Sequence, residues 1–307
     1  MDDGVQAFMQ TVNDGFPAVE TMTPDEARAV VADRRLPVEN LDDAGSEDRP
    51  VPGPAGDIPV RIYRPRGDGG PRPAVVFCHG GGFVFCDLDS HDSFCRAMSR
   101  HTGTVVVSVD YRRAPEHRAP AAAEDTFAAY RWVVEHAGEL GIERVLVAGD
   151  SAGGNLAAVT TLMCRERDTP MPSGQVLIYP VLDPSCDTDS YRRYATGYVN
   201  TRTAMRWYWR QYLGDSTPTP QIAPATAPSH AGLPPAVVVT AGLDVLHDEG
   251  VSYAHRLRTA NVPVVQRDYP GLFHGFVTIT PFPAGASARE LLWADMRRLL
   301  TKVEVAA

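Results

Sequence analysis

Ser151 stands in the pentapeptide Gly149-Asp150-Ser151-Ala152-Gly153, where an apolar run typical of a strand turns into a run with helical spacing. Such a turn predicts a strained serine backbone, and it requires small residues two positions away on each side. A helix that begins just after the serine would favour negative charge developing there. The pentapeptide therefore indicates a nucleophile, although a plain glycine-rich turn remains the alternative.

A second feature is the run of three glycines, Gly80, Gly81 and Gly82, that follows His79. We infer that it lets main-chain N–H groups approach a ligand closely, as acyl transfer requires for its oxyanion. We expect Gly81 and Gly82, with Gly80 as a further candidate, to act with the N–H of Ala152. A phosphate cradle is the alternative, but the chain has no GxxxxGK[ST] and no GxGxxG with a ribose-binding acid. His79 is expected to anchor the loop.

A serine nucleophile needs a base, and the base needs a carboxylate to orient it. Among nine histidines, His274 alone lies in a loop after the last predicted strand with glycines nearby, at Gly271 and Gly275. The other histidines weighed for this role are expected to be exposed helix or loop residues: His91, His101, His136, His230, His247 and His255. His274 is therefore the expected base.

The carboxylate should precede the base in the chain order Ser, Asp, His. Asp244 follows the predicted strand 236–240 closely, as an acid at a strand end should. Asp248 and Glu249 are its rivals, and they are better suited to the first turn of the next helix. The sequence thus predicts Ser151, His274 and Asp244 as the catalytic residues.

The elements that must position these residues alternate along the chain. Runs rich in β-branched residues predict strands at 74–78, 104–109, 144–147, 175–179, 236–240 and 264–269. Helices are predicted at 92–101, 121–139, 154–167, 249–259 and 288–303. Apolar strands that alternate with helices indicate an α/β fold, with a mostly parallel sheet covered on both faces.

Two segments interrupt this alternation. Thr23, Pro24 and Glu26 form a capping box that predicts a helix near the N-terminus, and residues 47–73 indicate early edge strands joined by turns. The stretch 185–231 is an insertion between two strands, and long insertions are usually functional. The expected organisation is 1–45 as the N-terminal part of a cap, 46–184 and 232–307 as the core, and 185–231 as the cap insertion.

The insertion carries apolar and aromatic residues at helical spacing. This stripe could line an acyl pocket, and packing of the cap on the core is the alternative. The substrate-pocket candidates are Phe83, Met205, Tyr208, Trp209 and Tyr212.

Composition narrows the class of partner. The 307 residues carry a formal charge of −9 without a Lys/Arg block, which argues against a nucleic-acid partner and favours a small neutral molecule. Five cysteines form no CxxC pair or metal-ligand cluster, so free buried thiols are expected. The chain begins acidic and has no apolar run of the ~18 residues that span a bilayer. We expect a cytoplasmic protein without an integral membrane segment.

With these residues in place, the chain resembles the hormone-sensitive-lipase-like esterases, a bacterial group of α/β-hydrolases, from Tyr63 to about Val303. The blocks that carry the resemblance are His79-Gly80-Gly81-Gly82, Asp110-Tyr111-Arg112 with Ala114-Pro115-Glu116-His117, Gly149 to Asn155, Asp244-Val245-Leu246 with Asp248-Glu249, and His274-Gly275-Phe276. Two positions depart from the family pattern, with Arg113 in place of a leucine and Arg118-Ala119 in place of a proline-aromatic pair.

The resemblance implies an α/β-hydrolase fold with an eight-stranded sheet, a helical cap, and hydrolysis of short- to medium-chain carboxyl esters without a cofactor or metal. It also suggests a homodimer. An amide-cleaving deacetylase or amidase with the same three residues is the nearest alternative. A non-catalytic binder of small molecules is a more distant one, because the HGF segment at His274 is intact.

Overall fold

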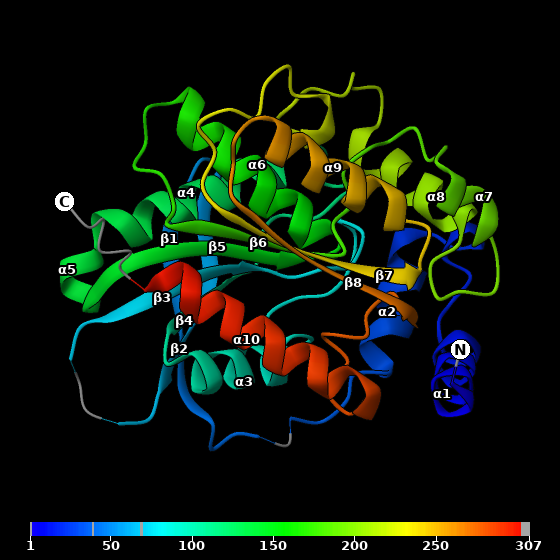
Figure 1. The fold of residues 1–307 in the computed structure, drawn as a ribbon, viewed down its shortest axis with the longest axis horizontal. Helices are drawn as coiled ribbons and strands as arrows, with labels where there is room; N and C mark the ends of the chain where they lie inside the picture. The colour runs from blue at the N-terminus through cyan, green and yellow to red at the C-terminus, as the bar shows by residue number, and fades with distance from the viewer. Residues whose placement is uncertain (1, 39, 68–69, 302–307) are drawn as a thin grey trace.

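A single mixed sheet forms the centre of the molecule. The computed structural model describes residues 2–38, 40–67 and 70–301, and in this part eight strands lie in the order β1-β2-β4-β3-β5-β6-β7-β8 (Figure 1). The strands are β1 Ala44–Gly53, β2 Gly56–Pro65, β3 Arg72–Cys78, β4 Val105–Val109, β5 Ile142–Asp150, β6 Gly174–Ile178, β7 Ala236–Leu243 and β8 Val264–Phe273. The strands from β4 to β8 in this order are parallel, which confirms the predicted runs.

Helices cover both faces of the sheet, as expected. Successive side chains of a strand point to opposite faces, so Val75 and Phe77 pack with α3 and α10, whereas Val76 and Cys78 pack with α4 and α6. The first pair of helices is α3 Asp92–Thr102 and α10 Ala286–Leu300, and the other face carries α4 Ala121–Glu135, α6 Ala152–Glu166 and α9 His247–Thr259 (Figure 1). Burial on both faces explains why these strands are apolar throughout.

The prediction of early edge strands holds for β1 and is wrong for β2. β2 pairs antiparallel with β1 on one side and with β4 on the other. The ladder to β4 begins at Val60, just after Pro59, whose carbonyl accepts the N–H of Asp110. Pro59 therefore comes just before the ladder between β2 and β4 and contributes only its carbonyl, so its missing N–H breaks no hydrogen bond of that ladder.

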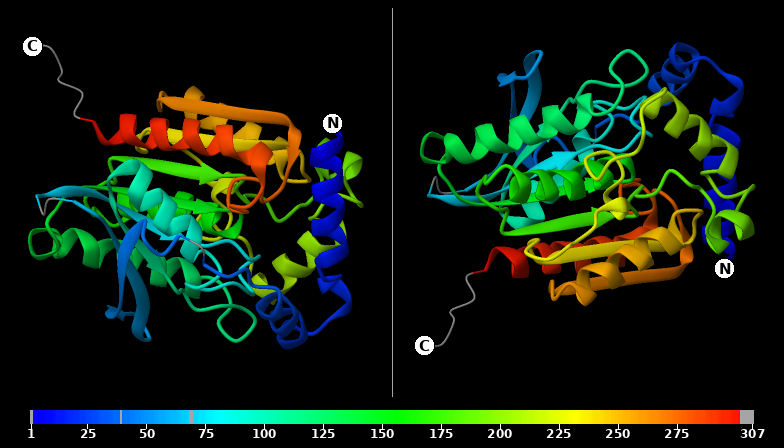
Figure 2. Two further views of the ribbon diagram at one scale, coloured as in Figure 1. Left: turned by 90° about the horizontal axis from the view of Figure 1, so that it is seen from below. Right: turned by 90° about the horizontal axis from the view of Figure 1, so that it is seen from above.

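Two segments far apart in sequence form a helical layer at the end of the sheet to which β5 to β8 point (Figure 2). The first holds α1 Asp3–Gly15, η1 Val19–Thr21 and α2 Pro24–Asp33, and the second holds α7 Asp189–Arg193 and α8 Arg202–Leu213. The short η2 Pro224–Thr226 follows in the same insertion and packs against α6. Asn13 joins them, since its side chain donates to the carbonyl of Gly197 at 2.9 Å and accepts from the N–H of Val199 at 2.7 Å. The domain boundaries named above remain predictions.

The ends of several elements differ from the sequence expectation. The capping box at Thr23 is present. The helix expected over 121–139 is interrupted at His136, where α4 gives way to α5 Ala137–Leu140. α10 follows η3 Pro283–Gly285 and ends at Leu300, and Val303, where it was expected to end, lies outside the described residues. The five cysteines are free, and only Cys86 is not fully buried. Within the described ranges, no helix is both long and apolar enough to cross a membrane.

Candidate active site

Ser151 occupies the sharp turn that joins β5 to α6. Its backbone has φ 54° and ψ −117°, a strained conformation for a residue with a side chain. A Cβ on Gly149 would lie 2.2 Å from the carbonyl oxygen of Gly153, and a Cβ on Gly153 would lie 1.9 Å from that of Cys78. The predicted need for small residues on both sides of the serine is confirmed.

The structure brings the three predicted side chains together. Ser151 Oγ lies 3.1 Å from His274 Nε2, and His274 Nδ1 lies 2.6 Å from Asp244 Oδ2. β7 ends one residue before Asp244 and β8 ends one residue before His274, so neighbouring parallel strands place both groups at one edge. Ser151 and His274 keep 7% and 8% of their surfaces exposed, whereas Asp244 keeps 1%. Solvent therefore reaches the serine and the histidine, and the carboxylate is enclosed.

The rival carboxylates have other partners. Asp248 Oδ2 accepts the N–H of Ser190 and its Oδ1 lies 2.8 Å from His247 Nδ1; burial raises the pKa of Asp248, and these hydrogen bonds outweigh it and lower the pKa. Glu249 is buried and accepts the N–H of Leu182 at 2.7 Å, and burial raises its pKa well above the usual range. Both lie in the first turn of α9, as expected, and neither contacts His274.

The glycine loop runs past the amino end of α6. Gly81 and Gly82 have φ values of 102° and 59°, which favour glycine. A Cβ on Gly81 would lie 2.2 Å from the carbonyl oxygen of Phe85, and one on Gly82 would lie 2.4 Å from the Tyr208 ring. In the described part of the chain, no hydrogen bond uses the N–H groups of Gly80, Gly81, Gly82 or Ala152. Four main-chain donors near Ser151 are thus free to bind a ligand.

His79 anchors the glycine loop. Its Nδ1–H donates to the carbonyl of Gly80 at 2.8 Å, and its ring stacks on Tyr111 at a centroid distance of 4.3 Å. The Tyr111 hydroxyl in turn donates to the carbonyl of His79 at 2.8 Å. Burial lowers the pKa of His79 to about 3, so the ring is neutral at physiological pH.

This pKa makes stability depend on pH. Unfolded histidine has a pKa near 6.5, so the unfolded chain takes up a proton that buried His79 refuses, and stability is lost as pH falls from 6.5 toward 3. The stability difference between wild type and His79→Gln should therefore shrink by about 2 kcal/mol between pH 7 and pH 5. Urea unfolding of both proteins at each pH measures it. A difference independent of pH would contradict the assignment.

A buried contact between His91 and Asp150 lies behind the nucleophile and was not predicted from the sequence. His91 and His230, expected to be exposed, are buried. His91 Nε2 lies 3.2 Å from Asp150 Oδ1, and a Cβ on Gly80 would lie 2.6 Å from Asp150 Oδ2. The carboxylate of Asp150, the residue before the nucleophile, thus lies between the glycine loop and His91. No sequence signal links these segments, because only the fold joins them.

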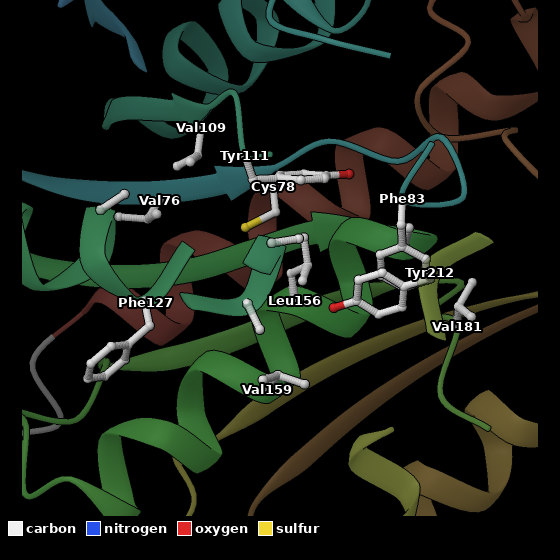
Figure 3. Packing of buried hydrophobic residues seen from close by; sticks show 14 of the residues in the cluster. Val76, Cys78, Phe83, Val109, Tyr111, Phe127, Leu156, Val159, Val181 and Tyr212 are labelled. Atoms are coloured by element: carbon white, nitrogen blue, oxygen red, sulfur yellow. The ribbon is translucent and has the colours of Figure 1, made fainter. Parts of the chain in front are cut away.

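The substrate-pocket candidates are packed among themselves. The rings of Phe83 and Tyr212 are stacked with centroids 3.9 Å apart, as Figure 3 shows, and Trp209 lies 5.7 Å from Phe83. Tyr208 lies against Gly82, and Met205 is also buried. The stripe packs the cap on the core, which was the alternative reading. Its role in a pocket remains a prediction.

A cavity of about 700 Å³, here named the side cavity, has none of these five residues in its walls. It is lined by parts of α2, α3 and α10, by residues 85–91 and 278–281, and by Arg113. Two wall residues contact neighbours of the triad. His91 faces Asp150, and the Thr278 hydroxyl lies 2.9 Å from that of Tyr179, whose ring is 4.5 Å from the His274 ring. The wall of the side cavity is therefore one residue removed from the catalytic groups, through Asp150 on one side and Tyr179 on the other.

Comparisons with known proteins agree with this geometry. A family model described as the α/β-hydrolase fold matches residues 75–278. The chain is 44% identical over 268 residues to the carboxylic ester hydrolase LipN of Mycobacterium tuberculosis, which covers 83% of this chain and 71% of that protein. It is 34% identical over 294 residues to the ethyl acetate hydrolase of Pseudomonas putida, and the match covers 90% of this chain and 92% of that protein.

A solved structure is similar throughout. The hyperthermophilic esterase from the archaeon Pyrobaculum calidifontis superposes with a TM-score of 0.88 at 39% identity, over 98% of this chain and 99% of that one. The family match, these relatives and the shared fold point to one group of enzymes. The chain belongs to the hormone-sensitive-lipase-like group of the α/β-hydrolase family and is a carboxylic ester hydrolase.

Proposed function

We propose that the chain is a serine carboxylesterase that hydrolyses short- to medium-chain acyl esters through an acyl-enzyme on Ser151. The observation that carries the proposal is the continuous contact from Ser151 Oγ through His274 to the buried carboxylate of Asp244. A neutral imidazole between a hydroxyl and a carboxylate can take a proton from one while the other stabilises the resulting charge.

In the first half of the reaction, Ser151 Oγ attacks the ester carbonyl carbon and His274 Nε2 takes the hydroxyl proton. Asp244 accepts the Nδ1–H of His274, which keeps the lone pair on Nε2. The oxyanion lies among the N–H groups of Gly81, Gly82 and Ala152, with Gly80 as a further donor. Donors held by the backbone need little reorganisation as the charge develops, which supports this role.

The intermediate then collapses. The bond from carbon to the alcohol oxygen breaks, and His274 gives its proton to the leaving oxygen, which leaves the acyl group on Ser151. A water molecule then attacks the acyl carbon and gives its proton to His274. The bond between the acyl carbon and Ser151 Oγ then breaks, His274 returns the proton to Oγ, and the carboxylic acid leaves.

Two observations support short to medium acyl chains. The Tyr208 ring lies against Gly82, and the Phe83–Tyr212 stack follows directly, so aromatic side chains fill the space beside the glycine loop. A relative named ethyl acetate hydrolase acts, by its name, on an acetyl ester. Together they favour a small acyl group next to the donors.

The experiment compares p-nitrophenyl esters of increasing acyl length with the isosteric p-nitroanilides. We expect acetyl and butyryl esters to react fastest, lauroyl esters slowly, and the acetyl anilide far more slowly than its ester, because an amide nitrogen must be protonated before it leaves. A higher kcat/KM for the anilide would favour the amide-cleaving alternative. Fastest turnover of the lauroyl ester would contradict the acyl preference.

A further inference from the structure

The side cavity is cationic in an acidic chain. Its walls carry five arginines, Arg28, Arg34, Arg35, Arg113 and Arg289, against three carboxylates, Asp87, Asp89 and Glu290. The formal charge of the whole chain is −9. The cavity therefore has the opposite sign to the protein as a whole, and a concave site of one sign concentrates ligands of the other.

Ion pairs between the wall residues neutralise only part of the positive charge of the arginines. Arg35 binds the carboxylates of both Asp87 and Asp89. Arg28 binds Glu116, which is not a wall residue. Two of the three wall carboxylates are thus already engaged by arginine, and the remaining cations face the cavity with less compensation.

Arg113 is the cation best placed to receive an anion. One of its terminal nitrogens donates to the carbonyl of Cys86 at 2.5 Å, and the Asp110 carboxylate is 4.0 Å away, beyond hydrogen-bond distance. No other hydrogen bond of Arg113 occurs within the described ranges. A guanidinium has five N–H groups in a fixed fork, so most of those on Arg113 are free to bind a carboxylate with two hydrogen bonds.

Arg289 adds uncompensated charge. It donates to the carbonyls of Phe276, Ile279, Thr280 and Phe282 and forms no ion pair in the part of the chain that the structure describes. Burial lowers its pKa, as expected for a cation held only by neutral acceptors. An anion bound in the cavity would offset this cost.

The rest of the wall is partly apolar, with polar side chains such as Asn40, Ser90 and Ser93 among the apolar ones. Phe94, Ala97 and Trp293 line one part, and Ile279 and Pro281 line another. The segment 278–281 follows His274, which must face the leaving oxygen in order to protonate it. An alcohol group that extends from His274 along this segment would pass Ile279 and Pro281, in a cavity whose walls also carry guanidinium groups.

We propose that the side cavity receives the alcohol part of the ester and that Arg113 binds a carboxylate on it, which makes esters of hydroxy acids the preferred substrate class. The proposal rests on the esterase function proposed above. Arg113 is then a specificity-determining residue that takes no part in the bond-breaking steps, and Arg289 strengthens the positive potential around it.

The test compares hexyl acetate with 6-acetoxyhexanoate, which differ by a terminal carboxylate. Hydrogen bonds to charged groups favour the acid by about 10- to 100-fold in kcat/KM, expressed mainly in KM. Arg113→Met should bring the ratio of the two kcat/KM values close to one, and Arg113→Glu should favour 6-aminohexyl acetate over both. The control Arg131→Met, on the exposed face of α4 beside Glu135, should keep the wild-type ratio.

Three results would overturn the proposal. The first is a wild-type ratio near one, and the second is a ratio unchanged by Arg113→Met. The third is a preference that arises only when the carboxylate lies on the acyl part, as in monohexyl adipate. Failure of the esterase function itself is distinct, because the wild type would then hydrolyse hexyl acetate no faster than Ser151→Ala does.

Discussion

Ser151→Ala should lower kcat for p-nitrophenyl acetate by about 10⁴- to 10⁶-fold. The change removes one oxygen, and that oxygen's hydrogen bond in the described structure is the 3.1 Å contact with His274. No other group can then form the acyl-enzyme at this position. The glycine loop and His274 stay in place, so only the residual effect of binding and oxyanion donors remains.

The control for this variant is Ser173→Ala. Ser173 lies just before the start of β6, whereas Ser151 follows the end of the neighbouring strand β5, so the two serines lie at opposite ends of the strands. The N–H of Ser173 donates to the carbonyl of Val145. We expect wild-type kinetics and urea unfolding for Ser173→Ala, and wild-type unfolding without turnover for Ser151→Ala. A Ser151→Ala protein that keeps a tenth of the activity would end the assignment of Ser151.

Asp244→Asn should lower kcat by about 10⁴-fold with little change in fold. One oxygen of Asp244 accepts the N–H of Leu246 at 3.1 Å, and the other accepts the Nδ1–H of His274 at 2.6 Å. If the side-chain oxygen of the asparagine keeps the hydrogen bond from the Leu246 N–H, the NH₂ group of its amide faces His274 Nδ1. The histidine must then carry its proton on Nε2, where it cannot accept one from Ser151.

The matched control is Asp248→Asn, which changes the rival carboxylate four residues further on. It removes a charge beside His247 and Ser190 without touching His274, so kcat should stay within about threefold of wild type. Steady-state kinetics of both variants on p-nitrophenyl butyrate decide between the carboxylates. A larger loss in Asp248→Asn than in Asp244→Asn would contradict the assignment of the acid.

The triad could be predicted because the signals for it are local. Runs of β-branched residues mark β3 and β4 to within two residues, and small residues on both sides of Ser151 mark a turn that no bulky side chain fits. Asp244 and His274 each follow a strand, and parallel neighbouring strands end at the same edge. Chain order then fixed their roles in the prediction.

Features that depend on contacts between distant segments could not be predicted. His91 resembles a surface residue in sequence, and its burial against Asp150 appears only when the fold brings the start of α3 to the end of β5. β2 has the prolines of an edge strand, but pairing with β4 makes it internal. The side cavity combines Arg113 with residues from α2, α3 and α10, and no periodicity in one segment reveals such a combination.

The proposed mechanism requires one activated serine that carries the acyl group. Incubation with a fluorophosphonate, followed by peptide mapping by mass spectrometry, tests it most directly. We expect one phosphonyl group per chain, attached to Ser151, with activity lost in proportion to labelling, protection by p-nitrophenyl acetate, and no label in Ser151→Ala. Full ester hydrolysis after the reagent has labelled Ser151, or inactivation by a label on a different residue, would rule out Ser151 as the nucleophile.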